Sequence, residues 1–342
     1  MSDPPEPAEP RISVICPVHN GASYLDACLT AIARSSAPIL QVIVVDDAST
    51  DRSAEIAAGY GAEVVKTAGG PLGPGAARNT ARRTARGEYL VFVDADVVVR
   101  PDAIERLVEA IREDAGVAAS FGSYDEAEAS TSIASKYGNL RHHFVHQTSS
   151  TEASTFWAGC GAVRAADFDA VGGFNARFEK PSIEDIDMGL RLHAQGRRIR
   201  LVHEAQATHL KIWTVWNLWK TDILCRAVPW SRLMVTSDSV PADLNTRSSA
   251  RVSALLSLAW IGCAGLAWID WRLGVGLAVA VALVWVGLNA DFLRLLRRVG
   301  GVRLCLGGAL LHWAYYVYAS LTFAYVALAH RLRRRFRPAS SG

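Results

Sequence analysis

Short apolar runs alternate with longer amphipathic segments over about the first 245 residues of the chain. Buried strands are predicted at 12–16, 42–45 and 89–93, because each run is short, apolar and bounded by turn residues. Amphipathic helices are predicted at 24–33 and 76–86, with a further helix starting at Ser53. Alternation at this spacing requires right-handed crossovers and produces a largely parallel sheet. We therefore expect a disordered tail over residues 1–10 and an α/β domain over 11–210.

The pattern changes beyond Arg251, where long uncharged runs replace the alternation. Residues 252–269 and 273–290 each approach the roughly 20 residues that a helix needs to cross a bilayer. A three-residue break separates them, which indicates a tight hairpin. A third run, 304–329, is interrupted by His312 alone. These runs predict a transmembrane region over 251–330, followed by a basic tail over 331–342.

Charge and cysteine content limit the cellular setting. The acidic, proline-rich N-terminus lacks the basic and apolar regions of a signal peptide, so the first domain is expected in the cytoplasm, at the inner membrane. The six cysteines are widely spaced, which favours reduced thiols over disulfides or zinc. A net charge of +3 is too small to indicate nucleic-acid binding. Arginines on both sides of the third run conflict with the preference of basic loops for the cytoplasm. That run therefore either spans the membrane or re-enters it, and its length favours a span.

Carboxylates follow two of the predicted strands. Asp94 and Asp96 come directly after the third strand, and residues i and i+2 of an extended chain point to one side. Both can therefore reach one Mg²⁺ or Mn²⁺, although an ordinary turn also explains them. Asp46 and Asp47 end the second strand, and Pro17 and Asn20 end the first. Ligands of such sheets bind beyond the carboxyl ends of the strands, so these groups are expected to converge on one crevice.

Several motifs together resemble glycosyltransferase family 2. They are the segments 15–20, 44–51, 77–79 and 87–96, followed in the same order by 171–175 and 184–192. The resemblance covers roughly residues 11–230. It implies a GT-A fold (Rossmann-like), a nucleotide-sugar donor such as a UDP- or GDP-sugar, a divalent metal (Mn²⁺ or Mg²⁺) and inversion at the anomeric carbon.

The resemblance also assigns roles to single residues. Donor binding falls to Pro17, Asn20, Asp46, Asp47, Arg78 and Asp94, with Asp46 slightly ahead of Asp47 as acceptor of a base N–H. Metal binding falls to Asp94, Asp96 and His209, although a surface histidine is an equally good interpretation of His209. Arg78 shares a helix with other arginines and can equally belong to a solvated face. The glycine-rich loop 69–75 either covers the diphosphate or is a plain flexible connection.

Asp185 is the candidate general base, because it matches the aspartate of the family's E-D motif. An inverting transfer needs a base on the acceptor side to take the hydroxyl proton. Glu184 and Asp187 share the same first helical turn and complete the expected group of active-site acids. Residues 182–185 also have the form of a capping box, so Asp185 can be interpreted as a helix cap.

Four further patterns concern helix faces, the membrane and processivity. Trp213, Trp216 and Trp219 recur every three residues, which predicts an interfacial amphipathic helix and linker over 211–250. The histidines at 142, 143 and 146 are interpreted as an exposed helix face. Processive members of the family carry a Q-x-x-R-W-like motif, and this chain has Arg226-Ala-Val-Pro-Trp230 instead. His312 either lines a lipid path or is satisfied by a neighbouring helix.

The sequence thus predicts a multi-pass membrane glycosyltransferase with a cytoplasmic catalytic domain. It moves one sugar from a nucleotide-sugar donor to a lipid or polyprenyl-linked acceptor, in contact with membrane lipids and without nucleic acid. A processive polysaccharide synthase and a non-catalytic nucleotide-sugar-binding membrane protein are the alternatives.

Overall fold

The computed structural model describes residues 9–127, 130–178, 180–236 and 248–335. Residues 334 and 335 are described by their backbone alone. These residues divide into two compact units. The first unit comprises the described parts of 1–129 and 146–211. The second comprises 130–145 and the described parts of 212–342. Helix α5 is inserted in the chain between two strands of the first unit, yet most of its residues belong to the second.

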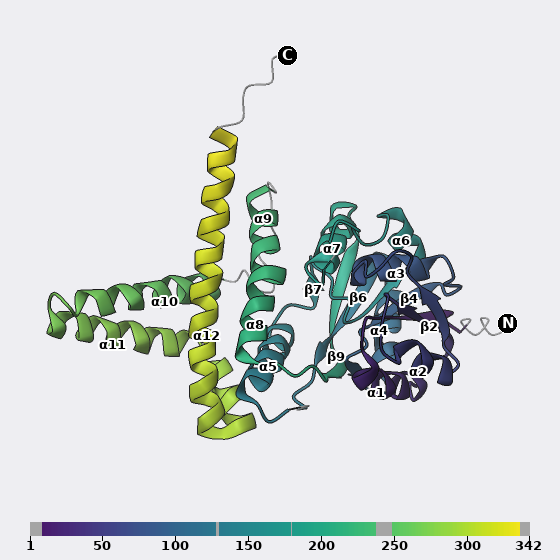
Figure 1. Cartoon of the computed structure of the whole chain (residues 1–342), viewed down its shortest axis with the longest axis horizontal. Helices are drawn as coiled ribbons and strands as arrows, with labels where there is room; N and C mark the ends of the chain where they lie inside the picture. The colour runs from purple at the N-terminus through teal and green to yellow at the C-terminus, as the bar shows by residue number, and fades with distance from the viewer. Residues whose placement is uncertain (1–8, 128–129, 179, 237–247, 336–342) are drawn as a thin grey trace, which may run out of the picture. The chain divides into compact units, whose positions relative to one another are not determined.

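The first unit is an α/β domain (Figure 1). Its elements in chain order are β1 Ile12–Val18, α1 Ala22–Ala33, β2 Ile39–Asp46, α2 Ser53–Gly59, β3 Glu63–Lys66, α3 Pro74–Arg82, β4 Tyr89–Val93, β5 Val97–Val99, α4 Ala103–Arg112, β6 Val117–Tyr124, β7 Glu152–Ala153, β8 Cys160–Arg164, α6 Ala165–Ala170, α7 Glu184–Ala194 and β9 Arg198–His209. The predicted strand over 89–93 is confirmed at both ends. Glycine at 196 has φ +74°, which is the backbone conformation that commonly follows the end of a helix.

The strands form one mixed sheet in the order β3-β2-β1-β4-β8-β6-β9-β5, with β7 paired to β9. The segment β3-β2-β1-β4 is parallel, as predicted. Beyond β4 the sheet is mixed: β8 runs antiparallel to both β4 and β6, whereas β6 and β9 pair in parallel. Strands β5 and β7 also run antiparallel to β9. The parallel segment brings the carboxyl ends of β2, β1 and β4 to one edge.

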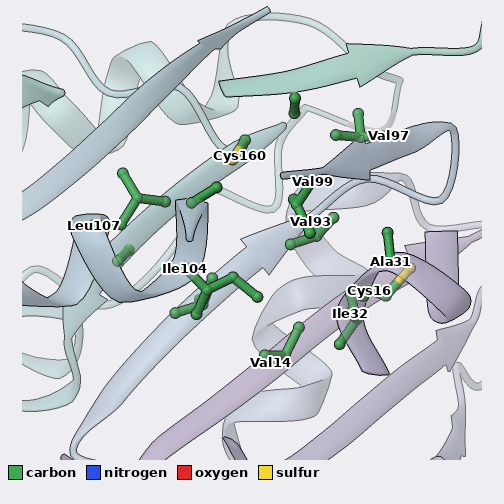
Figure 2. Packing of buried hydrophobic residues seen from close by; sticks show 14 of the residues in the cluster. Val14, Cys16, Ala31, Ile32, Val93, Val97, Val99, Ile104, Leu107 and Cys160 are labelled. Carbon is green, nitrogen blue, oxygen red and sulfur yellow. The ribbon is translucent and has the colours of Figure 1, made fainter. Parts of the chain in front are cut away.

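Helices cover both faces of this sheet, which explains why its central strands β1 and β4 are buried at every position. On one face, Val14 and Cys16 of β1 pack against Ile32 of α1 and Ile104 of α4 (Figure 2). The intervening residue, Ile15, points to the other face and belongs to a core that includes Ala77 of α3. The sheet is thus the middle layer of three, and its edge is held rigidly from both sides.

The second unit is helical. Its elements are α5 Ile133–Gln147 (its last two residues lie in the first unit), α8 Val215–Thr221, a π-helix η1 Asp222–Ala227, α9 Val228–Thr236, α10 Ser248–Leu266, α11 Trp271–Leu288 and α12 Ala290–Arg335. Helices α10 and α11 lie side by side as a hairpin (Figure 1). Within α12 the backbone is not helical at two glycines, and φ is +67° at the second, Gly301.

Two helices of the described chain, α10 and α11, are long and apolar enough to cross a membrane. Their most apolar windows are only 11% buried, so both helices present apolar side chains on nearly every side. The third expected span, 304–329, lies inside the longer α12 and is not among the helices that meet this criterion. Its crossing of the membrane stays a prediction.

His312 is satisfied by neighbouring helices, which decides one alternative left open by the sequence. The side-chain amide of Asn289 donates to the Trp285 carbonyl (2.8 Å) and to the Ser253 hydroxyl (3.1 Å). Its oxygen must therefore accept from His312 Nε2 at 3.2 Å. The bare Nδ1 of His312 then accepts from the Tyr137 hydroxyl at 3.1 Å. This directed chain of hydrogen bonds joins α5, α10, α12 and the end of α11.

Two sequence-based interpretations of surface faces are wrong. Trp213 precedes α8 and is 5% exposed, whereas Trp216 is 71% exposed, so the three tryptophans do not share one exposed face. Trp213 is buried because it packs with Tyr137 and Leu218 in the core of the second unit, and the Ser135 hydroxyl accepts from its backbone N–H at 2.7 Å. His143 and His146 are also buried, and His146 contacts the Gly122 carbonyl at 3.0 Å.

Candidate active site

The carboxyl ends of three neighbouring parallel strands carry the predicted donor-side residues. Asp46 is the last residue of β2, Asp94 follows β4, and Pro17 lies at the end of β1, in register with Val45. The sheet therefore places these groups at one edge, as the sequence predicted. Asn20 joins two of these ends, since its side-chain oxygen accepts from the Thr50 backbone N–H at 2.8 Å.

Asp46 and Asp47 are both buried, but the structure uses them differently. Asp46 Oδ1 accepts one hydrogen bond, from the Ser49 backbone N–H at 2.9 Å. Asp47 accepts from the backbone N–H groups of Leu72 and Gly73 and from the Thr67 hydroxyl, each at 2.8 Å. The carboxylate of Asp47 is thus committed to the glycine-rich loop. That loop is anchored and is not a plain flexible connection.

Arg78 lies between acids of two different elements and is 3% exposed in its side chain. Its Nη2 contacts Asp94 Oδ1 at 2.5 Å, and its Nη1 contacts Glu184 Oε1 at 3.3 Å. The guanidinium also lies 5.3 Å from the ring centre of Phe174. Arg78 is therefore not on a solvated helix face. It is the buried counter-ion of Asp94 and Glu184.

The predicted metal-binding residues fall into a pair and a neighbour. His209 Nε2 lies 3.5 Å from Asp96 Oδ2. The imidazole stacks on the ring of Tyr124, with ring centres 4.5 Å apart and an interplanar angle of 9°. Burial acts to raise the pKa of Asp96, but the hydrogen bond and charge of His209 outweigh it and lower that pKa. His209 is not a surface histidine, because it is only 9% exposed.

Asp94 and Asp96 remain partly open to solvent, with 35% and 24% of their side chains exposed. Among the residues that the structure describes, no group of three or more His, Cys, Asp or Glu has the arrangement of a protein-only metal site. Two oxygen ligands and one imidazole nevertheless suit Mn²⁺ or Mg²⁺, which often complete their coordination with substrate phosphates and water. The residues present fit a cation of that kind.

Asp185 lies in the first turn of α7 and does not cap the helix, because the N-cap residue is Ile183. Its carboxylate accepts from the backbone N–H groups of Ala158 (3.2 Å) and Ile186 (2.8 Å). Burial and the nearby charge of Glu184 raise the pKa of Asp185 to about 7, against the opposing effect of Arg78. A carboxyl group with this pKa can accept a proton near neutral pH.

The two other acids of this turn hold the surrounding structure. Glu184 is buried, accepts from the Ser182 backbone N–H at 2.9 Å and contacts Arg78. Asp187 contacts Arg191 Nε at 2.9 Å. Arg191 in turn donates to the carbonyl of Gly173 at 2.7 Å and to that of Val171. Asp187 therefore supports the 171–173 loop.

Sequence reasoning missed the residues that orient these groups. Tyr124 was not singled out, because a single tyrosine at the end of a strand carries no motif. Asp125, the next residue, is 5% exposed and accepts from the Thr208 hydroxyl at 2.9 Å, next to His209. A buried acid directly after an apolar strand is the signal that could have drawn attention to it.

Residues 13–172 match the model of glycosyl transferase family 2, and residues 139–212 match that of the N-terminal domain of galactosyltransferase. The first unit belongs to glycosyltransferase family 2. The family 2 domain is also similar to the uncharacterized glycosyltransferase EpsJ of Bacillus subtilis, at 35% identity over 105 residues. That match covers 29% of this chain and 30% of EpsJ, so the chain spans less than a third of the relative.

Two solved structures share the GT-A fold of this chain. The mannosyltransferase PcManGT from Pyrobaculum calidifontis, in complex with GDP-Man and Mn²⁺, has a TM-score of 0.57 at 19% identity. The match covers 93% of this chain and 88% of the PcManGT chain. TarS 1-349 of S. aureus, in complex with UDP, has a TM-score of 0.50 at 18% identity, with coverages of 96% and 93%. Likeness at these identities shows the fold.

Proposed function

We propose that the chain is an inverting, metal-dependent glycosyltransferase that moves a single sugar from a nucleotide-sugar donor to a lipid or lipid-linked acceptor at the cytoplasmic face of a membrane. The observation that carries this proposal is the placement of Asp185. A carboxyl group with a pKa of about 7 interacts through Arg78 with the charges that follow β4. A base and a donor-side acid thus share one charged network.

On the donor side, Asp46 accepts an N–H of the nucleotide base. Asp96 and His209 would hold the divalent cation, with Asp94 as the neighbouring acid. Such a cation would supply positive charge for the departing nucleoside diphosphate. Arg78 holds Asp94 in place, which differs from both the donor binding and the solvated face considered from sequence. Complexes of the neighbouring folds with GDP-Man and Mn²⁺ or with UDP support a donor of this class.

On the acceptor side, Asp185 takes the proton of the attacking hydroxyl. The acceptor oxygen forms its bond to the anomeric carbon while the bond from that carbon to the phosphate oxygen breaks. Attack from the face opposite the leaving group inverts the configuration. The nucleoside diphosphate leaves with the electron pair, and the proton stays on Asp185.

The hairpin of α10 and α11 supports the choice of a membrane-associated acceptor. The two helices have 19 and 18 residues, which at 1.5 Å per residue approach the roughly 30 Å of a hydrocarbon core. Their apolar side chains are exposed almost all round. A lipid environment would cover them.

The proposal is tested with purified full-length chain in phosphatidylcholine nanodiscs, with Mn²⁺, UDP- or GDP-sugars and a lipid extract as acceptor source. Labelled sugar should move into the organic phase. Asp185→Asn is expected to lower kcat by about 10²–10⁴-fold with donor binding retained, and Asp96→Asn should weaken metal-dependent donor binding. Asp169→Asn is the matched control, because Asp169 belongs to an exposed ion pair with Arg82. Near-normal turnover by Asp185→Asn would remove the base assignment.

Product length separates this function from the processive alternative. A single-transfer enzyme gives a product that does not lengthen with time, whereas a synthase gives a ladder. Donor hydrolysis without acceptor, measured under the same conditions, excludes the non-catalytic alternative if it is metal-dependent.

A further inference from the structure

A cluster of charged and aromatic side chains in the second unit has no part in the site described above. The Asp222 cluster comprises Arg141 of α5, Trp219 of α8, Asp222 and Arg226 of η1, and Tyr315 and Tyr318 of α12. Asp222 is 2% exposed. It accepts from Arg141 Nη2 at 2.8 and 3.0 Å, from Arg226 Nη1 at 2.8 Å and from the Tyr318 hydroxyl at 2.6 Å. Its carboxylate is therefore fully used.

The Asp222 cluster has more donors than acceptors. Arg141 Nη1 and Trp219 Nε1 are buried, and neither has a hydrogen-bond partner among the described residues. Buried donors are normally paired, and an unpaired one destabilises the protein. Formal charge shows the same imbalance, since two guanidinium groups face one carboxylate. What the cluster lacks is an anionic acceptor.

The surroundings of the unpaired donors are aromatic, and one guanidinium of the Asp222 cluster is exposed. The guanidinium of Arg141 stacks over Tyr315, with Cζ 4.2 Å from the ring centre, and Trp219 packs near Tyr318. Arg226 has 47% of its side chain exposed, against 12% for Arg141, so the cluster meets the surface at Arg226. Asp222 and Arg226 lie on the π-helix η1, and a π-helix is a rare form that is often found at functional sites.

We propose that the Asp222 cluster binds the phosphate group of a lipid phosphate. Guanidinium groups bind phosphate through paired, charge-assisted hydrogen bonds, and an indole N–H adds a further donor. A phosphate at Arg226 supplies the acceptors that Arg141 Nη1 and Trp219 Nε1 lack and balances the extra positive charge. A lipid source fits because the same unit carries the exposed apolar hairpin of α10 and α11. This inference rests on the proposed lipid-linked acceptor and specifies its charged group.

Arg226 belongs to the segment that stands where processive relatives carry their Q-x-x-R-W-like motif. The altered spacing left that arginine without a role in the sequence. In the structure it shares Asp222 with Arg141. Arg226 of the altered motif would thus contact the phosphate group.

The test uses full-length chain in phosphatidylcholine nanodiscs and measures binding of decaprenyl phosphate by thermal shift and tryptophan fluorescence, without donor. Uncharged decaprenol and inorganic phosphate are the comparison probes. The wild type should bind decaprenyl phosphate at least 10-fold more tightly than decaprenol. Arg226→Gln should weaken the binding of decaprenyl phosphate by about 10-fold, and Trp219→Phe should weaken it by a few-fold. Binding of decaprenol should be unchanged in both variants.

Arg141 needs a paired variant, because its loss alone leaves Asp222 buried without its principal counter-ion. Arg141→Gln with Asp222→Asn removes both charges together and should also weaken the phosphate lipid. If inorganic phosphate displaced decaprenyl phosphate at an equal or lower concentration, the site would be assigned to free phosphate and the lipid proposal would be overturned. Equal binding of decaprenyl phosphate and decaprenol by the wild type, or unchanged binding in all three variants, would overturn the proposal.

Metal-dependent donor hydrolysis by the same samples keeps this outcome distinct from the proposed function. Hydrolysis that persists while the variants bind lipid phosphate normally would reject the Asp222 cluster and leave the enzyme assignment intact. If the wild type shows no hydrolysis, the enzyme assignment is rejected, whatever the lipid-binding measurements show.

Discussion

Asp185 owes its chemistry to neighbours that its own sequence segment only partly supplies. Glu184 is adjacent in the chain, but Arg78 and the Ala158 N–H come from other elements. Burial and Glu184 raise the pKa of Asp185, whereas Arg78 and the backbone N–H groups lower it. The result is a carboxyl group that titrates near neutrality.

The pH dependence of transfer follows from that pKa. Asp185 must be deprotonated to act as a base, and its pKa is raised to about 7. We therefore expect kcat/KM to be level above about pH 8 and to fall by about tenfold per pH unit below 7. A profile between pH 5.5 and 9 checks this. A rate that stays level down to pH 5.5 would contradict the base assignment.

Replacing Arg78 tests its role as a buried counter-ion. Arg78→Met leaves Asp94 and Glu184 without their partner, which should cost about 3–5 kcal/mol of unfolding free energy. Since Arg78 lowers the pKa of Asp185, its removal should also move the acidic limb of the rate profile to higher pH. Arg82→Met on the same helix is the control, because it breaks a partly exposed pair that should contribute under about 1 kcal/mol. Equal denaturation curves for the two variants would refute this role.

The candidate acids could be found from sequence because the signals are local. Asp94 and Asp96 follow a buried strand, and Asp185 lies in the first turn of a helix. The partners of Arg78 could not be found in this way, since Glu184 lies 106 residues away in the chain. The use of Asp47 as a loop anchor was hidden for the same reason. Long-range contacts, and not residue types, decided these roles.

At the scale of elements, the parallel half of the sheet was predictable and the mixed half was not. Strand, helix and strand repeat regularly up to β4, and crossover connections then fix the direction. After β4 the connections vary in length, and α5 is inserted between β6 and β7. Nothing in the period-two pattern of β8 tells whether it runs parallel or antiparallel to its neighbours.

The loop between β3 and α3 should depend on one side chain. Asp47→Ala removes the acceptor for Leu72, Gly73 and Thr67, which we expect to cost about 2–4 kcal/mol. Proteolysis within residues 68–73 should become faster, as measured by mass spectrometry of timed digests. Glu55→Ala, which loses only an exposed ion pair with Arg52, should digest like the wild type. A loop that is no more sensitive in Asp47→Ala would show that the anchor is dispensable.

At the scale of the whole molecule, the exposed hairpin allows a direct test of membrane insertion. Val279 lies in the middle of α11 and is 53% exposed. Val279→Arg should disfavour insertion by about 2.5–3.5 kcal/mol and lower the carbonate-resistant fraction in cell membranes. Leu40→Arg, at an exposed position of the first unit, should leave that fraction unchanged. If Val279→Arg instead stays fully membrane-integrated, α11 does not cross a bilayer.

The hydrogen bond between Tyr137 and His312 joins residues 175 positions apart. During synthesis at about 5–20 residues per second, roughly 10–35 s separate the appearance of these two partners. For most of that interval, Tyr137 and Leu140 of α5 lack their packing contacts with Phe292 and Leu311 of α12. The apolar side chains of α5 therefore stay partly uncovered on the nascent chain until α12 has been made. Completing the second unit is thus a late event in biogenesis, and cleavage of the chain after Lys211 would leave α5 permanently uncovered.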